Sequence, residues 1–313
     1  MYKGKGLHHM GMGVENIKPM MEFYQETLQC TVMYEDFTAN VWLAMPDMFR
    51  QNDHAFGGVI MDQKVHGIRV ELIWLTVPKP KPIRKGGALY GDLGVFKMQF
   101  VVGDVEKFYQ DFKGKVNILS PPKSADIPGL GDYSFVLAKD PEGNLLEFGS
   151  WAGSGVKDGF GGSQWMSVSV TDLERSMAWY KKYAGWDTIV AEPHELFSGL
   201  VDEASNASGT QVRSVLLANS KGEGKLELVE QLKPRGRSIP FNAYWGDFGY
   251  LEVCHDYGHE DLRDLARWHE DEGVEFLHRP VNFGVAENYE IWFMYVKDPD
   301  GSPVEFLTQV PVK

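Results

Sequence analysis

The feature that most constrains the fold of this 313-residue chain is an ending that occurs twice. One copy runs from Asp140-Pro141 to Glu147-Phe148, and the other runs from Asp298-Pro299 to Glu305-Phe306. In each copy Asp-Pro-x-Gly predicts a turn, and the apolar residues around the glutamate predict a strand. The two glutamates, Glu147 and Glu305, lie 158 positions apart, which indicates that the chain consists of two related halves.

The beginnings of the two halves match as well. An alternating strand around His9 and another around Trp165 are each followed by a polar turn and an amphipathic helix. His9 and Trp165 are 156 positions apart, which agrees with the offset of the endings within two positions. We therefore predict two domains, residues 1–152 and 163–313, joined by a glycine-rich stretch.

Each half divides again into two modules. A further strand opens near residue 94 in the first half and near residue 246 in the second, and a segment with helical periodicity follows each. Glu71 and Glu227 lie in apolar strands, each 62 positions after His9 and Trp165 respectively. We therefore predict four modules, which span residues 6–77, 94–151, 163–232 and 246–310.

Composition limits the partners and the location of the protein. The formal net charge of −13 disfavours nucleic acids and anionic membranes, because an acidic surface repels both. No apolar run is long enough to span a bilayer, and the first residues lack a signal-peptide core, so we expect a cytoplasmic protein. Two cysteines, Cys30 and Cys254, are too few for a disulfide framework.

The sequence resembles the vicinal-oxygen-chelate superfamily, which includes glyoxalases, bleomycin-resistance proteins and extradiol dioxygenases. The resemblance covers nearly the whole chain and depends on three motifs: the His9 to Val14 opening with Phe23-Tyr24, the Thr171 to Glu174 opening with Trp179-Tyr180, and the two Asp-Pro-x-Gly-x-x-x-Glu endings. It implies an α+β fold of four βαβββ modules, paired into two glyoxalase-like domains with curved mixed sheets. In that family a metal lies in the cup of such a sheet.

The family pattern has a ligand at the start and the end of both modules of a domain. These positions are occupied in the first domain by His9, Glu71, Lys97 and Glu147, and in the second by Trp165, Glu227, Phe248 and Glu305. Imidazole and carboxylate ligands suit Fe, Mn, Ni, Co or Zn. The resemblance therefore implies a metal site of His9, Glu71 and Glu147 in the first domain, and this site is the candidate active site. It also implies a second domain without a metal.

Lys97 departs from this pattern, because an ammonium group has no lone pair to offer a metal. It is a candidate for an ion pair with Glu147 or Glu71, for a catalytic acid, or for binding an anionic substrate. Strand alternation places Gln99 on the same face as Lys97, so Gln99 is a candidate substrate-binding residue. Tyr133 is another, with core packing as the alternative.

The same alternation predicts that His8 points away from His9, as a surface or interface residue. His9 and Glu71 would then face the cup, since residues at even spacing along a strand share a face.

The function that we expect is a metal-dependent, glyoxalase-like lyase, isomerase or oxygenase. It would act on a small oxygenated organic substrate, with Lys97 and Glu71 as catalytic residues. Two alternatives remain: a metal-free protein that binds a drug or metabolite, and a metal-free lyase or isomerase that uses Lys97. A homodimer is compatible with the resemblance, since cups in that superfamily often form between pairs of modules.

Overall fold

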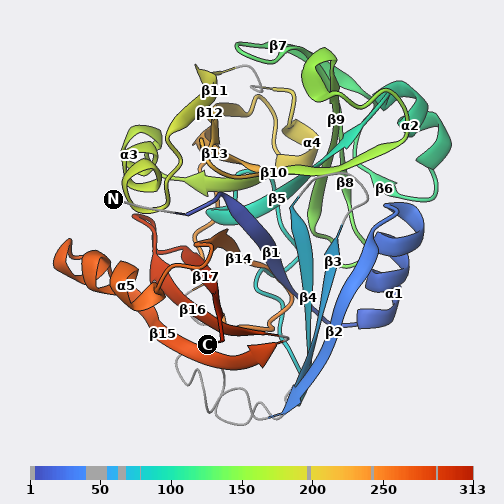
Figure 1. Ribbon diagram of the computed structural model, residues 1–313. Coiled ribbons are helices and arrows are strands. Elements are labelled where there is room, and N and C mark those ends of the chain that lie inside the picture. Colours follow the sequence, from blue (N-terminus) through green and yellow to red (C-terminus); the bar gives the residue numbers. More distant parts are fainter. Residues whose placement is uncertain are drawn as a thin grey trace.

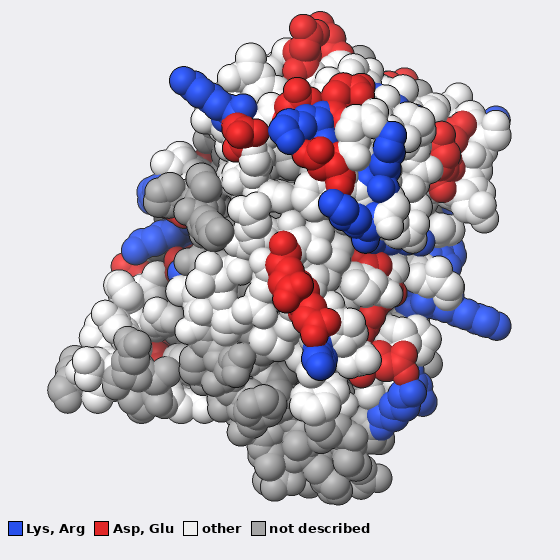
Figure 2. All heavy atoms as spheres, turned by 90° about the vertical axis from the view of Figure 1, so that its right-hand side faces the viewer, with Lys and Arg blue, Asp and Glu red and all other residues white. Residues whose placement is uncertain are grey.

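The computed structural model describes residues 4–39, 55–62, 68–77, 79–195, 199–240, 243–286 and 288–312. Figure 1 shows two strongly curved sheets, one above the other, with most of the helices at the periphery of the view. No helix in the described ranges is long and apolar enough to cross a membrane. On the face drawn in Figure 2, acidic and basic side chains alternate and form no continuous basic surface over the described residues.

The first two modules each start with a strand and a helix, and further strands follow. The first module consists of β1 (Leu7–Val14), α1 (Ile17–Glu22) with a π-helical continuation (Phe23–Thr27), β2 (Thr31–Ala39), β3 (Ala55–Asp62) and β4 (Arg69–Val77). The second consists of β5 (Gly94–Val102), α2 (Val105–Phe112), β6 (Asn117–Ile118), β7 (Lys123–Ile127), β8 (Gly131–Lys139) and β9 (Leu145–Trp151), and a 3-10 turn (Ala152–Ser154) follows it.

The last two modules repeat this order. The third consists of β10 (Phe160–Val170), α3 (Leu173–Tyr183), β11 (Thr188–His194), α4 (Asp202–Ser205), β12 (Gln211–Ala218) and β13 (Lys225–Lys233). The fourth consists of β14 (Gly249–Asp256), α5 (Leu262–Asp271), β15 (Phe276–Ala286), β16 (Tyr289–Lys297) and β17 (Pro303–Pro311). Helices α2, α3 and α5 each begin at an aspartate whose side chain accepts a backbone N–H of the first turn, which stabilises the helix start.

The two sheets combine modules from different halves of the chain. One sheet has the order β15-β16-β17-β14-β1-β4-β3-β2, and the other has β11-β12-β13-β10-β5-β9-β8-β6 with β7 paired to β8. The first and fourth modules therefore share a sheet, joined by antiparallel β1 and β14, and the second and third share the other, joined by β5 and β10. We call the concave sides of these sheets the outer-module cup and the inner-module cup.

The predicted α+β fold of four modules in two curved mixed sheets is confirmed. The expectation that the two modules of each half share a cup is wrong. The repeat in the sequence shows which modules are alike, but it carries no information on which modules pair. Residues 78–93 and 234–248 separate the modules of each half, and they are long enough to let each module pair elsewhere.

The repeated turn motif connects the modules of each half in another way. Asp140 accepts the backbone N–H of Glu142 and of Asn144, and Tyr24 of the first module donates to it at 3.4 Å. Asp298 has the same role in the second half, where the hydroxyl of Tyr180 donates to it at 3.1 Å. Burial raises the pKa of each aspartate to about 6. The turn thus anchors the helix of the preceding module within the core between the sheets.

Candidate metal centre

The strand register defines one equivalent position in each module. Within each module the first strand runs parallel to the last strand, and the glutamate near the module end pairs with one residue of the first strand. The four pairs are Gly11–Glu71, Gln99–Glu147, Ser167–Glu227 and Cys254–Glu305. The residue two positions earlier lies on the same face as that glutamate. These residues are His9, Lys97, Trp165 and Glu252.

The outer-module cup brings one imidazole and three carboxylates together from four strands. His9 Nε2 is 3.2 Å from Glu71 Oε2 and 3.4 Å from Glu305 Oε2. His9, Glu71 and Glu252 each have a candidate ligand atom within 4.8 Å of those of the other two. Gly11 makes this possible, because a Cβ at that position would lie 1.7 Å from Glu252 Oε1.

The electrostatics of this cluster favour a cation at its centre. His9 Nε2, Glu305 Oε2 and both carboxylate oxygens of Glu252 are buried without a well-formed hydrogen bond in the described part of the chain. Burial raises the pKa of Glu252 well above its usual value, and the charges of Glu305 and Glu71 add to the effect. Burial acts to lower the pKa of His9, but the acidic groups around it outweigh burial and raise it.

The residues present therefore fit a divalent metal. One imidazole nitrogen and carboxylate oxygens are ordinary ligands of Fe, Mn, Ni, Co and Zn, and a bound cation would compensate the buried carboxylates. His9, Glu71, Glu252 and Glu305 are the residues that would hold it.

The inner-module cup has the same geometry with a different set of residues. Lys97 Nζ donates to Glu147 Oε2 at 2.5 Å and lies 3.0 Å from Glu227 Oε2. Tyr133 donates its hydroxyl to Glu147 Oε1, and Ser167 donates to Glu227. The protein thus supplies a cation of its own between the two carboxylates.

This cup is also filled by its own side chains. Lys97, Gln99 and Tyr133 are completely buried, and Trp165 occupies the fourth equivalent position. Burial alone would lower the pKa of Lys97, but Glu147 and Glu227 outweigh it and raise that pKa. Lys97 is therefore a charged ammonium group at neutral pH and is poorly suited to be a base.

The structure separates residues that the sequence grouped together. It brings His9 and Glu71 together but places Glu147 with Lys97 in the inner-module cup, so the predicted metal set of His9, Glu71 and Glu147 is wrong. Gln99 and Tyr133, the candidate substrate-binding residues, lie in the inner-module cup as well.

Sequence reasoning missed Glu252 and assigned its position to Phe248. The signal was present, because Glu252 is the only charged residue in the apolar run from Tyr250 to Cys254. The error is one of alignment, because Phe248 precedes β14, whereas Glu252 lies within that strand and pairs with Gly11.

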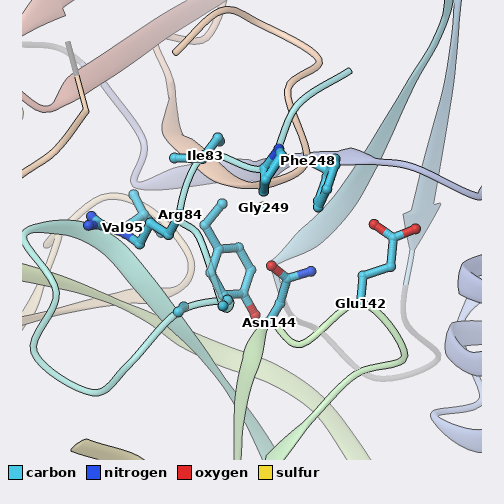
Figure 3. A pocket seen from close by; sticks show the side chains of 12 residues that line it. Ile83, Arg84, Val95, Glu142, Asn144, Phe248 and Gly249 are labelled. Atoms are coloured by element: carbon cyan, nitrogen blue, oxygen red, sulfur yellow. The ribbon is translucent and has the colours of Figure 1, made fainter. Parts of the chain in front are cut away.

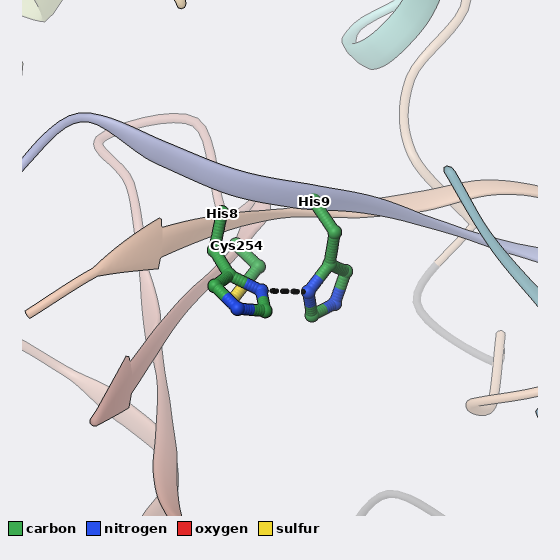
Figure 4. Close-up of side chains that lie close together, drawn as sticks. All are labelled: His8, His9 and Cys254. Carbon is green, nitrogen blue, oxygen red and sulfur yellow. Dashed lines mark hydrogen bonds between the residues drawn. The ribbon is translucent and has the colours of Figure 1, made fainter. Parts of the chain in front are cut away.

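His8 does not point away from the cup as the alternation predicts. Leu7 pairs with His255 and His9 pairs with Cys254, so His8 is an extra residue in a β-bulge. Figure 4 shows the rings of His8 and His9 on the same side of β1, next to Cys254. The prediction for His8 is therefore wrong, because the bulge shifts the alternation by one residue.

Two cavities lie beside the cups, where the linkers between modules meet the sheets. One has a volume of about 330 Å³, and Figure 3 shows Ile83, Asn144 and Phe248 among its lining residues. The other has a volume of about 260 Å³ and borders Trp245 and Leu251. These two residues also belong to the apolar cluster of the outer-module cup, so the second cavity adjoins the wall of the candidate metal centre.

The sequence matches the model of the Glyoxalase/Bleomycin resistance protein/Dioxygenase superfamily over residues 6–148 and 162–306. The chain belongs to this superfamily. A mutant of glyoxalase I from Zea mays superposes with a TM-score of 0.64 at 18% identity, over 97% of this chain and 92% of that chain. Glyoxalase I from Zea mays gives a TM-score of 0.61 at 16% identity, again over 97% and 92%.

These superpositions extend over almost the full length of both chains, and at such low identity they show a common fold. A search of curated proteins finds no match. Within the superfamily, the function of this chain must therefore be argued from its own site.

Proposed function

We propose that the protein is a metal-dependent enzyme of the lyase or isomerase type, with its site in the outer-module cup. The observation that supports this most directly is the buried cluster of His9, Glu71, Glu252 and Glu305. Three carboxylates that face one another in a buried cup are costly unless a cation compensates them. The described residues of the cup supply the imidazole of His9 for this purpose, whereas the inner-module cup has Lys97.

We assign a different role in the reaction to the bound metal and to Glu71. A bound divalent metal would act as a Lewis acid for a carbonyl or hydroxyl oxygen of the substrate. Glu71 is the most accessible of the carboxylates, with a side chain that is 17% exposed against 5% for Glu305. Glu71 is therefore best placed to accept a proton from the carbon next to that oxygen and to return it.

The apolar walls of the cup indicate that part of the substrate is apolar. Ile73 and Leu307 each follow a candidate ligand by two positions on the same strand face, and Trp245 and Phe293 belong to the same apolar cluster. A small oxygenated compound with an apolar body would bury these surfaces on binding.

The composition of the site favours proton transfer over oxygen chemistry. Non-haem iron oxygenases commonly hold iron with two histidines and one carboxylate, and they leave several coordination positions open. Here one histidine and three carboxylates would hold the metal, with Glu71 and Glu305 3.2 and 3.4 Å from His9 Nε2. This ligand set differs from that of the oxygenases, and we therefore propose proton transfer as the chemistry of the cup.

An enzyme based on Lys97 gains no support from the geometry. Lys97 is completely buried between Glu147 and Glu227, which raise its pKa. A metal-free binding protein remains the second candidate, and the elevated pKa of Glu252 favours it in one respect, because a protonated carboxylic acid lowers the charge of an empty cup.

The test is the metal content of purified, tag-free protein and its affinity for added Mn, Fe, Co, Ni and Zn. Wild type should bind one metal ion per chain, and His9→Ala and Glu252→Gln should lose it. Tyr133→Phe is the matched control, because it alters the inner-module cup alone and should retain the metal.

Two outcomes would contradict the proposal. Metal binding that survives in both His9→Ala and Glu252→Gln would place the site elsewhere. A wild-type protein that binds none of these metals but binds apolar ligands tightly would make it a binding protein.

A further inference from the structure

His8 links the candidate ligand His9 to the guanidinium group of Arg69. His8 Nδ1 lies 2.7 Å from His9 Nδ1, and Arg69 Nη1 lies 2.7 Å from His8 Nε2. The bulge in β1 turns His8 to the concave side, and the parallel register places Arg69 beside His9. The three residues therefore form a chain that ends at His9 Nε2, the atom that faces Glu71 and Glu305.

Only one arrangement of protons satisfies this chain. Arginine is always a donor, so His8 Nε2 must accept from Arg69. Because His8 Nε2 then has no proton, the ring has a single N–H, at Nδ1, which lies 2.7 Å from His9 Nδ1. His8 then donates to His9 Nδ1, and His9 must have its own proton on Nε2.

That arrangement is the wrong one for a metal. A metal on His9 Nε2 needs the lone pair of that atom, and the proton of His9 must then be on Nδ1. His9 Nδ1 would donate to His8 Nδ1, and His8 would have its proton on Nε2, where it would face the N–H of Arg69. Two donors cannot share this contact, and a doubly protonated His9 would meet the same conflict.

We propose that His8 is a positioning residue for His9 and that Arg69 competes with the metal for it. The inference rests on the proposed metal site. On metal binding, the proton of His8 Nδ1 shifts to His9 Nδ1, the proton of His9 Nε2 leaves to water, and His8 Nε2 takes a proton from water. The number of protons on the pair is unchanged, and the Arg69–His8 contact breaks.

The proposal predicts opposite effects for two neighbouring substitutions. Arg69→Met removes the competing donor and should raise the affinity for Co(II) about tenfold, within the range typical of residues behind a metal ligand. His8→Phe removes the acceptor for His9 Nδ1 and should lower the affinity about 10- to 100-fold. Both are measured by titration of the metal-free full-length chain with Co(II), from the visible absorption of the bound ion and by calorimetry.

A third variant distinguishes positioning from packing. In His8→Asn the amide oxygen takes the place of His8 Nδ1 and accepts from His9 without a second ring nitrogen for Arg69 to hold. Affinity should therefore recover to at least the wild-type value, and Arg69→Met should have no further effect in the His8→Asn background. Arg213→Met, which removes an arginine of the other sheet, is the control for loss of positive charge.

The results separate this inference from the proposed function. If wild type binds Co(II) but Arg69→Met leaves the affinity unchanged or lowers it, the competition is refuted and the metal site stands. If His8→Phe binds as wild type does, His8 does not position His9. If wild type binds no metal at all, both proposals fail. Circular dichroism of each variant shows whether it is folded, and Arg69→Gln replaces Arg69→Met if the latter is not.

Discussion

The outer-module and inner-module cups have the same strand arrangement and the same four positions, but they differ in the source of positive charge. Both have glutamates at the ends of their modules, Glu71 and Glu305 in one and Glu147 and Glu227 in the other. In the inner-module cup Lys97 neutralises the carboxylates, and Tyr133 and Ser167 donate to them. In the outer-module cup a third carboxylate, Glu252, is added instead.

The difference shows that one fold can hold a neutralised polar cluster in one cup and an uncompensated cluster in the other. The inner-module cup needs no ligand from solution to compensate its carboxylates, because Glu147 and Glu227 each accept a hydrogen bond from a protein side chain. The outer-module cup keeps buried polar atoms without well-formed hydrogen bonds, at His9, Glu252 and Glu305 in the described chain. Such atoms are destabilising unless something from solution binds them, and they are common at functional sites for that reason.

Both cups are completed within one chain. The first and fourth modules join through β1 and β14, and the second and third join through β5 and β10. A second copy of the protein is therefore not needed to supply a residue at the four equivalent positions of either cup. The expectation of a homodimer remains a prediction without a structural requirement.

The largest expected contrast comes from replacing the residue at the same position in each cup. Lys97→Met leaves two buried carboxylates without their cation and should lower the free energy of unfolding by about 3–5 kcal/mol. His9→Met in metal-free protein should cost less than half of that, because the side chain of Glu71 is 17% exposed and keeps contact with water, whereas that of Glu147 is 2% exposed. Chemical denaturation of both variants beside wild type measures the difference; equal losses would show that the inner-module cup does not depend on its ion pairs.

The repeat predicted the modules but not their partners. Periodicity and the Asp-Pro-x-Gly endings are local signals, and they located the four modules and the glutamates at their ends. Pairing between β1 and β14 joins residues more than 230 positions apart, which no local pattern encodes. The predicted cup therefore combined Glu147 with His9, although the two belong to different sheets.

The sequence predicted the candidate site incompletely for two reasons. The bulge at His8 reverses the face of one histidine, and the alignment of the modules assigned Phe248, which precedes β14, to the position of Glu252. Strict alternation fails at a bulge, because an extra residue shifts every side chain beyond it. The four glutamates at the module ends lie on regular parts of their strands, where each pairs with the first strand of its own module.

A smaller effect is expected from Gly11, which has no side chain, whereas its equivalents in the inner-module cup are Gln99 and Ser167. In Gly11→Ala the new Cβ would lie 1.7 Å from Glu252 Oε1 and would force that carboxylate out of the cup. Metal affinity should fall about 10- to 100-fold while the protein remains folded. Calorimetric titration with a divalent metal measures this, with Ser167→Ala as the matched control; unchanged affinity in Gly11→Ala would remove Glu252 from the ligand set.

The smallest effect separates the paired lysine of the inner-module cup from a merely buried one. The carboxylates raise the pKa of Lys97 above its ordinary value of 10.5, although burial alone would lower it. Its contribution to stability is therefore fully present below about pH 10.5 and is lost as the pH rises through the higher value of the folded state. The stability difference between wild type and Lys97→Met should stay constant from neutral pH to about pH 10.5 and then decrease.

Lys225 should show the opposite pH dependence, because burial lowers its pKa. Wild type should therefore gain stability relative to Lys225→Met as the pH approaches 10.5 from below. Denaturation of the three proteins across this pH range measures both slopes, and slopes of the same sign would show that Lys97 is buried without effective pairing.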